Sequence, residues 1–488
     1  MNTSDFEYYD HLGYISKYYF EQNDQFEFGN SFGEIIKTYP FELSVDSHSI
    51  VQFLNHHYFL GDRTLIKGLK KSPWLSKPSA NNDSWESASL PEHGKKVLAI
   101  EEIASSLYQK IRSEILKYID GKKSIGILLS GGMDSRVVAM ILEDIRKSNR
   151  TDISVVALNW GIENSRDKIY AQQIAGMYSW EFKSFELNPA LLKEAIYETA
   201  QAGAEFSPVN VHAMHKIRDT AGIDCILAGS YGDSIGRGEY SKKHVTELKS
   251  LEKPIINWFN LLKRQVIIDA KDALTLDVAQ YRKKFPRKVE QEHCEVERQC
   301  HYMRRMLNPC MGIINQKTPV YQIFTDPKVF GFMWSLDPSI RGNDIYEKLF
   351  EMYSPSLLEI PWARTGLRYG DTSGTPDALL SNHNEYGKWI RTELRSYVNE
   401  TLNDDCVKSL NLFNKDSIDS LSKHFHRMAS GSKSSKVEQF LLWICALGEI
   451  NRQYDLNSPD PKTSVVDRLN GKLVSPLLAF GHTKLKGF

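Results

Sequence analysis

The sequence has no excess of charge of either sign. Its 488 residues include 61 Lys and Arg and 61 Asp and Glu, so the formal net charge at pH 7 is zero. Proteins that bind nucleic acid through its phosphates, or that lie on an anionic membrane, usually carry a basic surplus. We therefore expect neither nucleic acid nor an anionic lipid surface as a partner, although a local basic patch would not show in the total.

Cysteine and long apolar runs are also scarce. The six cysteines all lie at or after position 225, and the N-terminus is polar and acidic, unlike a secretory signal. The most apolar stretch, Phe440 to Leu447, is far shorter than the roughly 20 residues that a membrane-spanning helix needs. We expect a cytoplasmic protein with reduced thiols and no membrane span.

No group of cysteines and histidines has the spacing of a zinc site. Cys294, Cys300, His301 and Cys310 lie near one another in the sequence, but not as paired ligands on tight turns. We interpret these cysteines as buried thiols on a helix. The sequence has no internal repeats, and its 41% apolar and 25% charged residues are ordinary for a globular protein of two or three domains.

What the sequence does contain is a strand joined to a helix by a glycine-rich turn. An apolar run ends at Leu129, and apolar residues recur at helical spacing from Val138 onward. Gly131 and Gly132 let backbone N–H groups approach a ligand at the positive end of that helix. The Gly-Lys-Ser/Thr of a P-loop is missing. The turn therefore predicts a phosphate site of another kind.

This turn, Ser-Gly-Gly-Met-Asp-Ser from Ser130 to Ser135, resembles the SGGxDS signature of the ATP pyrophosphatase superfamily. In that superfamily the loop holds the β- and γ-phosphates, and ATP is cleaved between the α- and β-phosphates. Hydroxyl groups of Ser130 and Ser135 can bond phosphate, and the Asp134 carboxylate can hold Mg²⁺. The alternative is a turn whose glycines only supply the bend, with Asp134 or Ser135 capping the helix.

The strand and helix pattern continues downstream. Residues 153–158 and 167–178 predict a second strand and a second helix, which implies a right-handed parallel unit. A third strand, Cys225 to Ala228, runs into a second glycine-rich turn at residues 229–238. Because the carboxyl ends of parallel strands share one edge of the sheet, we expect the second turn to face the first across one cleft. On its own, the second turn would be a weak signal.

The residues before this α/β unit predict smaller elements. Aromatic and polar side chains alternate around Asn23-Asp24 in residues 11–29, as in a β-hairpin. A helix is expected at residues 31–40, and Asp46 is placed to cap another. We expect a connecting loop over residues 72–94, followed by a helix from Val97 to Ile119.

The residues after it, from Lys253 onward, predict mainly helices. The last long helix is expected over residues 435–454. Residues 318–321 and 360–366 interrupt the helices, and we expect loops there that carry substrate contacts.

These features, in this order and with Gly61-Asp62-Arg63-Thr64-Leu65 upstream, resemble the synthetase domain of the asparagine synthetase and β-lactam synthetase family. The resemblance begins near residue 11 and is specific only at the two turns. It implies an α/β fold, a parallel-sheet ATP pyrophosphatase (adenine nucleotide α-hydrolase-like) domain over residues 94–488 with a helical C-terminal part. Residues 1–93 would form a truncated N-terminal hairpin region and a linker.

In that family a carboxylate attacks the α-phosphate of ATP to give an acyl-adenylate and pyrophosphate, and an amine then displaces AMP. The resemblance implies an ATP-dependent amide-forming ligase or amidotransferase with ATP and Mg²⁺ as cofactors. Its metal ligands would be Asp134 and Asp233, and its catalytic residues Asp233, Arg364, Ser230 and Tyr231. ATP contacts would come from Leu129, Ser130, Gly131, Gly132, Asp134, Ser135, Leu158, Ala228 and Gly229.

Three departures from the family pattern affect the expected activity. Full-length members begin with a glutaminase domain whose N-terminal residue is cysteine, whereas residue 2 is Asn here. Ser230 and Tyr231 stand where asparagine synthetases carry Glu-Gly, so the carboxylate need not be aspartate. The lysine that steadies the charged intermediate has no clear counterpart, but Arg364 lies in the matching loop. The alternative for Arg364 is a surface ion pair.

We therefore expect an enzyme that adenylates a small-molecule or peptide carboxylate and transfers ammonia or an amine to it. Free ammonium or an amine, which a separate glutaminase could supply, is expected to be the nitrogen donor. A macrolactam-forming peptide cyclase of the same family would share every ATP-site residue. A third hypothesis is a nucleotide-binding scaffold without catalysis, although such a scaffold would not need to keep both aspartates.

Overall fold

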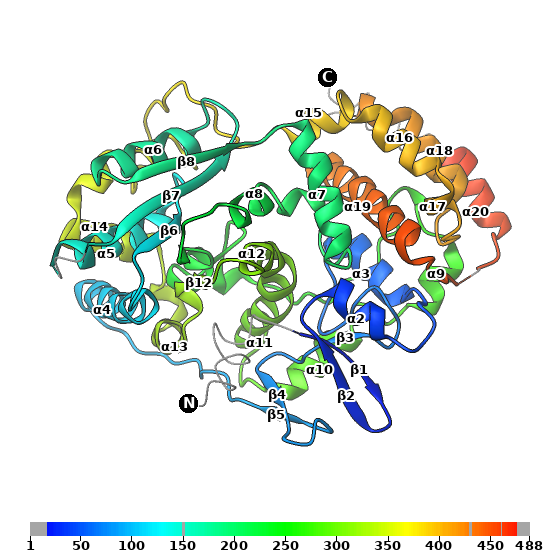
Figure 1. Ribbon diagram of the computed structural model, residues 1–488, viewed down its shortest axis with the longest axis horizontal. Coiled ribbons are helices and arrows are strands. Elements are labelled where there is room, and N and C mark those ends of the chain that lie inside the picture. The colour runs from blue at the N-terminus through cyan, green and yellow to red at the C-terminus, as the bar shows by residue number, and fades with distance from the viewer. Residues whose placement is uncertain (1–16, 149–151, 429–431, 460, 476–488) are drawn as a thin grey trace.

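The computed structural model describes residues 17–148, 152–428, 432–459 and 461–475. Its centre is a five-stranded sheet in the order β12-β9-β6-β7-β8, in which every pairing is parallel (Figure 1). The predicted α/β class with a parallel sheet is confirmed. The strands are β6 (Ser124–Leu128), β7 (Ser154–Gly161), β8 (Glu181–Glu186), β9 (Cys225–Ala228) and β12 (Val320–Gln322).

Two strands of this sheet were not predicted from the sequence. β8 reads EFKSFE and is largely half-buried at one edge of the sheet, so it lacks the apolar run of a covered strand. β12 has three residues and begins directly after Pro319. The expectation of a loop over residues 318–321 was wrong for Val320 and Tyr321, because Val320–Gln322 pairs with β9 as the other edge of the sheet. The substrate contacts expected there stay a prediction.

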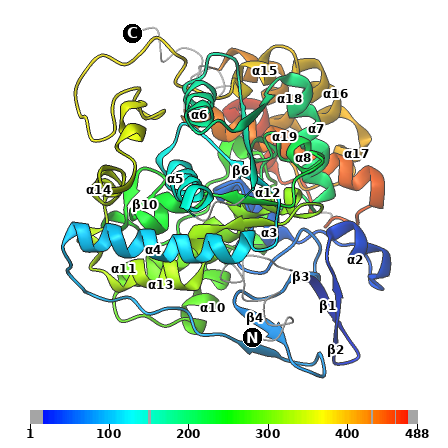
Figure 2. The same ribbon diagram turned by 60° about the vertical axis from the view of Figure 1, so that its left-hand side comes forward.

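Helices cover both faces of the sheet, and the alternation of side chains along each strand explains why. Ile125 and Ile127 of β6 share an apolar core with α4 (Ile100–Ile119), α5 (Met133–Ser148) and α6 (Arg166–Met177). Leu128 points into a smaller core on the other face, with α8 (Met214–Arg218) and α12 (Asn308–Asn315). Figure 2 shows α4 as a long helix beside α5.

The N-terminal elements largely follow the prediction. β1 (Tyr18–Gln22) and β2 (Gln25–Gly29) form the expected hairpin, with Asn23 and Asp24 at φ values of 53° and 59°, as a type I′ turn requires. The helices α2 (Phe32–Thr38) and α3 (Ser47–His56) begin after the capping residues Ser31 and Asp46.

The connection that follows is more structured than expected. β3 (Lys70–Lys71) adds to β1, and β4 (Ser76–Pro78) pairs with β5 (Trp85–Ser87) inside the segment that we expected to be a loop. These strands are too short to show an alternating pattern. α4 begins at Ile100 instead of Val97.

A second large core joins the N-terminal elements to helices far along the chain. Phe53 of α3 stacks on Trp443 of α19 (Ser432–Tyr454), with ring centroids 3.9 Å apart. The Trp443 indole also donates to the carbonyl of Ala204, just after α7 (Pro189–Gln201), at 2.7 Å. Residues 17–69 thus pack against the C-terminal part (Figure 1). The division of the chain at residue 93 stays a prediction.

The chain from Lys253 onward is mainly helical, as predicted. Cys294, Cys300 and Cys310 are buried thiols on helices, which confirms the interpretation of their spacing.

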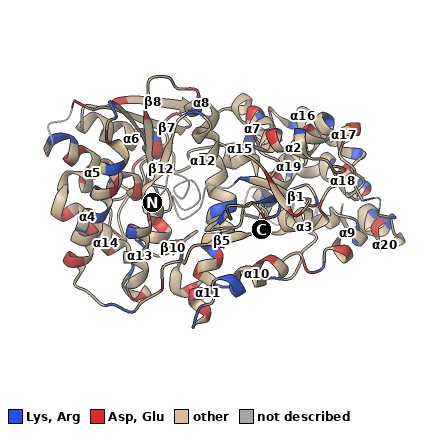
Figure 3. Cartoon of the chain, turned by 60° about the horizontal axis from the view of Figure 1, so that its bottom comes forward, with Lys and Arg blue, Asp and Glu red and all other residues tan. Residues whose placement is uncertain are grey.

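No helix in the described ranges has the length and apolarity to cross a bilayer. Basic and acidic residues are interspersed along the chain in Figure 3. The other helices are α9 (Arg264–Asp269), α10 (Leu276–Lys284), α11 (Glu290–Glu297), the π-helical η6 (Arg298–Leu307), α13 (Pro327–Ser335), α14 (Asn343–Tyr353), α15 (Tyr386–Arg391), α16 (Arg395–Asn403), α17 (Asp405–Lys408), α18 (Lys415–His424) and α20 (Val465–Leu469).

Candidate functional site

The first glycine-rich turn connects β6 to α5, and acceptors already engage several of its N–H groups. The N–H of Gly132 donates to Ser130 Oγ at 3.1 Å, and that of Ser130 donates to Ser135 Oγ at 3.2 Å. The N–H of Gly131 donates to the carboxylate of Asp167 at 3.1 Å. Because phosphate is also an anionic acceptor, it could replace the Asp167 carboxylate at this N–H.

The second glycine-rich turn touches the first through Asp134. A Cβ atom on Gly229 would lie 2.7 Å from the carbonyl oxygen of Asp134, and one on Gly232 would lie 2.6 Å from the Asp134 Cβ. Only glycine allows so close an approach. The two turns thus lie together at the carboxyl end of the sheet, as predicted, but they are in direct contact here, and the cleft between them stays a prediction.

The two predicted metal ligands lie in this contact and interact electrostatically. Burial, followed by the nearby Asp134 carboxylate, raises the pKa of Asp233 to about 7. The N–H of Ser234 donates to Asp233 Oδ1 at 2.8 Å. The second turn therefore brings a second carboxyl group close to Asp134, and a cation bound between the two would favour the ionised form of Asp233.

An arginine that we did not predict completes the site. The Arg237 guanidinium donates to both carboxylate oxygens of Asp134, at 3.3 and 3.4 Å, and to Asn343 Oδ1 at 2.7 Å. It lies near the rings of Tyr346 and Trp362, and its side chain is only 2% exposed. The sequence signal was an arginine between two glycines of the second turn, Gly236 and Gly238, which we had treated as part of the turn.

Arg364 reaches the same network from the predicted substrate loop. Its Nη1 lies 2.7 Å from Glu239 Oε1, and its guanidinium stacks over Trp362 at 4.4 Å. Glu239 also accepts from Arg237 at 3.3 Å. The Arg364 side chain is 36% exposed. The structure thus connects Arg364 to Asp134 through Glu239 and Arg237.

A buried arginine fixes this loop against the first turn. Arg136 of α5 is fully buried and donates to the carbonyl oxygens of Ile360 at 2.6 Å and Gly131 at 3.0 Å. The N–H of Ala363 also donates to the Gly131 carbonyl, at 3.1 Å. Carbonyl oxygens compensate the buried Arg136 charge, although burial lowers its pKa to about 10. Residues 360–366 therefore lie beside the first turn, and the substrate contacts expected from this loop stay a prediction.

The other predicted site residues lie at the end of the sheet or in the second turn. Leu129, Leu158 and Ala228 are buried at the end of the sheet, where the Leu129 N–H donates to the Leu158 carbonyl at 2.9 Å. Contact with adenosine stays a prediction for these three residues. Ser230 is half-buried. The Tyr231 hydroxyl lies 3.4 Å from the Met303 carbonyl in η6, so its phenol points toward that helix.

The pair of aspartates fits a magnesium ion in kind, since carboxylate oxygens are its preferred ligands. Within the described ranges, no group of three or more His, Cys, Asp or Glu residues could hold a metal, so Asp134 and Asp233 would share the ion with water or phosphate. Arg237 does not prevent this, because a carboxylate has about four lone-pair positions. The two Arg237 contacts are also long for charge-assisted hydrogen bonds.

Comparison with known proteins shows what this part of the chain is similar to. Residues 115–308 match the family model described as asparagine synthase, and both glycine-rich turns lie within that match. This part of the chain is therefore similar to the asparagine synthase family. A putative asparagine synthetase [glutamine-hydrolyzing] 1 of Methanocaldococcus jannaschii is 24% identical over 179 residues, which cover 34% of this chain. The match spans 32%, or about a third, of that protein's length.

Two solved structures are similar to parts of this chain, with low TM-scores. NMN synthetase from Francisella tularensis has a TM-score of 0.23 and 15% identity, covering 43% of this chain and 97% of that chain. The U34-tRNA thiolase NcsA from Methanococcus maripaludis has a TM-score of 0.21 and 17% identity, covering 44% of this chain and 78% of that chain. The parallel sheet itself establishes the fold class.

Proposed function

We propose that this chain is an ATP-dependent carbon–nitrogen ligase that forms an amide through an acyl-adenylate. The observation that carries the proposal is the contact of the two glycine-rich turns around Asp134. This contact gathers phosphate-binding N–H groups, two carboxylates and the Arg237 guanidinium at the carboxyl end of a parallel sheet, where α/β proteins bind their ligands. The asparagine synthase domain match covers this region.

In the proposed reaction, a carboxylate oxygen of the substrate attacks the α-phosphorus of ATP. The bond from that phosphorus to the bridging oxygen breaks, and pyrophosphate leaves with its electron pair. Ammonia or an amine then attacks the acyl carbon of the adenylate. AMP leaves, a proton is lost from nitrogen, and the amide remains.

The residues of the chain would act mainly by binding and orientation. The N–H groups of Gly131 and Gly132 would hold the pyrophosphate portion, with the hydroxyls of Ser130 and Ser135 exchanging their internal hydrogen bonds for phosphate. Asp134 would hold Mg²⁺ together with Asp233. When bound, this ion would neutralise charge that develops on the leaving pyrophosphate.

Arg237 and Arg364 would stabilise the negative charge on the phosphate groups that Mg²⁺ does not neutralise. Arg237 is fixed by Asp134, Glu239 and Asn343, so little reorganisation would be needed during the reaction. Arg364 is more exposed and lies on the loop fixed by Arg136, where it can meet the substrate. The substrate itself is proposed to be a small-molecule or peptide carboxylate.

Pyrophosphate release and exchange test this proposal directly. The purified chain is incubated with ATP, Mg²⁺ and single carboxylates from a panel, first without and then with ammonium or an amine. We expect one class of carboxylate to support exchange of labelled pyrophosphate into ATP, and the amine to convert the adenylate to amide and AMP. Asp134→Asn is the inactive control.

Other outcomes would distinguish the remaining hypotheses. Release of ADP and phosphate would contradict cleavage between the α- and β-phosphates. ATP binding without exchange for any carboxylate would favour a nucleotide-binding scaffold. A peptide product lighter by one water, formed without added amine, would identify a macrolactam-forming cyclase.

A further inference from the structure

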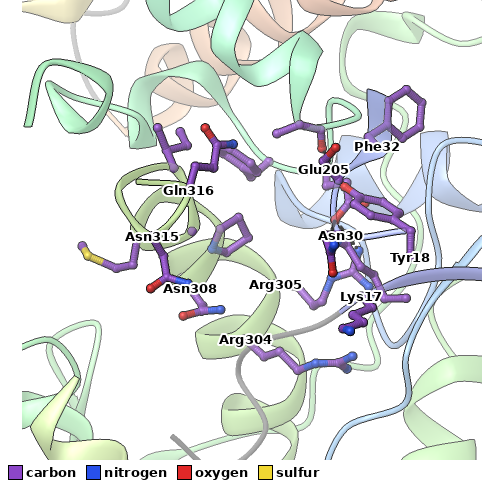
Figure 4. Close-up of a pocket in the computed structure, with 18 of the residues that line it drawn as sticks. Lys17, Tyr18, Asn30, Phe32, Glu205, Arg304, Arg305, Asn308, Asn315 and Gln316 are labelled. Carbon is purple, nitrogen blue, oxygen red and sulfur yellow. Dashed lines mark hydrogen bonds and ion pairs between the residues drawn. The ribbon is translucent and has the colours of Figure 1, made fainter. Parts of the chain in front are cut away.

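A cavity of about 570 Å³ lies apart from the two glycine-rich turns. It is bounded by the N-terminal hairpin, the end of α7, and the helices η6 and α12. Figure 4 shows Asn308, Asn315 and Gln316 on one side and Lys17 and Glu205 on the other. The volume is within the range of small-molecule sites, roughly 300–1,000 Å³. No lining residue belongs to either turn.

The charged residues that line the cavity are mainly basic. Four are cations, and Glu205 is the single acidic residue among the described residues of the lining. Arg304 is paired with Asp62 at 3.0 Å, and Arg305 with Glu205 at 2.9 Å. These arginines supply fixed positive charge, but their donors are engaged by the protein. The cationic residues are Lys17, Lys71, Arg304 and Arg305.

Lys71 lines the cavity and has one long ion pair and one aromatic ring contact. Its ammonium lies 3.7 Å from Glu205 Oε2, the oxygen that also accepts from Arg305 at 2.9 Å, and 3.6 Å from the centre of the Tyr18 ring. Burial lowers the pKa of Lys71 to about 8, and Arg305 and Arg304 oppose its charge. A further anion beside Lys71 would raise its pKa again, because it would stabilise the charged ammonium.

The rest of the lining favours carboxylate groups over a single phosphate ion. Side-chain amides of residues such as Asn30, Asn315 and Gln316 surround the space, together with apolar atoms of Ile313 and Val320. The cavity is much larger than one inorganic ion, which occupies a volume on the order of that of a few waters, about 30 Å³ each. Amides can donate to several carboxylate oxygens at once.

We propose that this cavity is a binding site for a small di- or tricarboxylic acid, held by Lys71 and the surrounding amides. The site is separate from the proposed ATP site and does not depend on the proposed function. Its location between the N-terminal hairpin and α12 means that the bound acid joins segments far apart in the sequence.

Calorimetric titration with citrate at pH 7 and constant ionic strength tests the proposal. We expect saturable binding at one site, and a loss of affinity of about tenfold in Lys71→Gln, because a buried charge partner is removed. Lys70→Gln is the matched control, since Lys70 is the neighbouring residue of β3, is exposed and is outside the lining. This control should change the affinity by less than about twofold.

A variant that keeps every charge provides a second test. Gly312 lines the cavity, and a Cβ there would meet no atom within 4 Å, so Gly312→Leu can enter the open space without a clash at its first atom. Leucine also favours the helix over glycine. The control is Gly176→Leu in α6, another helical glycine with no atom within 4 Å. Citrate binding should be lost only in Gly312→Leu.

Several results would overturn the proposal. These are no saturable binding of citrate to the wild-type chain, equal weakening by Lys71→Gln and Lys70→Gln, and unchanged binding in Gly312→Leu. Inorganic phosphate binding as tightly as citrate, with the same response to the variants, would make the site one for phosphate. Asp134→Asn should bind citrate normally, and loss of binding there would show that the cavity is not separate from the ATP site.

Discussion

Arg237 donates to both carboxylate oxygens of Asp134 across the contact between the two glycine-rich turns. The pair therefore links the turn that follows β6 to the turn that follows β9. Arg237 also pairs with Glu239, which in turn pairs with Arg364. A series of ion pairs thus connects charged side chains from three separate segments of the chain. The role of each side chain can be tested by replacing it.

Asp134→Asn should remove pyrophosphate release while the fold remains. The carboxylate lies at the contact between turns, where it would hold metal, and asparagine has nearly the same shape. We expect a loss of at least about a hundredfold in kcat/KM, equivalent to about 3 kcal/mol of transition-state stabilisation. Circular dichroism checks the fold. Near-normal pyrophosphate release by Asp134→Asn would show that the metal assignment is wrong.

Arg237→Gln should affect both stability and activity. Arg237 is 2% exposed, and its removal leaves Asp134, Asp233 and Glu239 close together without their shared cation. We expect a loss of about 3 kcal/mol in the free energy of unfolding, as for other broken buried ion pairs. Arg237→Lys keeps the charge but cannot donate in a fork, so it should be intermediate in both unfolding and kcat/KM.

Unchanged stability or unchanged activity in Arg237→Gln would contradict one or both of the proposed roles of Arg237. If Arg237→Gln matched the wild-type chain in thermal melting and in pyrophosphate release, the guanidinium would be dispensable for orienting Asp134. If only stability fell, Arg237 would have a structural role without a part in the reaction.

The sequence was informative where chemistry and backbone geometry depend on the same residues. Gly131 and Gly132 indicated a close approach of backbone to ligand, and the three central strands had the apolar runs of buried parallel strands. The Asn23-Asp24 turn predicted the hairpin, because few residues adopt positive φ so readily.

The parts that could not be predicted depend on contacts distant in the sequence. β8 and β12 are recognised only by their partners β7 and β9. Nothing local to Arg237 shows that Asn343, more than a hundred residues later, accepts one of its hydrogen bonds. The role of Arg136 likewise requires that the carbonyl of Ile360 lie beside α5.

Glu295 should make the stability of the protein depend on acid pH. Burial alone would raise its pKa, but Arg341 at 2.7 Å and His93 at 3.2 Å hold the pKa at about 2, against an ordinary value of 4.5. The Tyr240 hydroxyl also donates to it, next to Glu239 of the site. This lowered pKa corresponds to about 3 kcal/mol of stability.

The contribution of Glu295 to the free energy of unfolding is complete above pH 4.5 and is lost as the pH falls toward 2. In this range the Glu295 carboxylate takes up a proton less readily in the folded state than in the unfolded state. Thermal melting between pH 7 and pH 3 measures it. Glu295→Gln should melt at a lower temperature at pH 7 and lose less stability on acidification, whereas Glu292→Gln in the same helix should follow the wild-type profile. Parallel pH profiles for wild type and Glu295→Gln would contradict the assignment.

Arg364 is either part of a surface ion pair or a residue that acts in the reaction, and steady-state kinetics can distinguish the two roles. Its 36% exposure and its pair with Glu239 fit a surface ion pair, which contributes at most about 1 kcal/mol to stability. Its loop is nevertheless fixed through Arg136 to the first turn, which is proposed to hold the pyrophosphate portion of ATP. If the guanidinium stabilises charge in the transition state, Arg364→Ala should lower kcat and kcat/KM together by about tenfold or more, with little change in melting temperature.

Two further variants make the Arg364 test specific. Arg364→Lys should keep more activity than Arg364→Ala if one positive charge is sufficient, because lysine retains the charge without the fork. Glu239→Gln breaks the ion pair from the other side and leaves Arg364 in place. A surface-pair role predicts that Arg364→Ala loses little stability and is as active as the wild type. Glu239→Gln should lose more stability than Arg364→Ala, because Glu239 also pairs with the buried Arg237. A role in the reaction predicts that Arg364→Ala loses activity whatever its melting temperature, because the lost charge acts on the reacting phosphate and not on the fold.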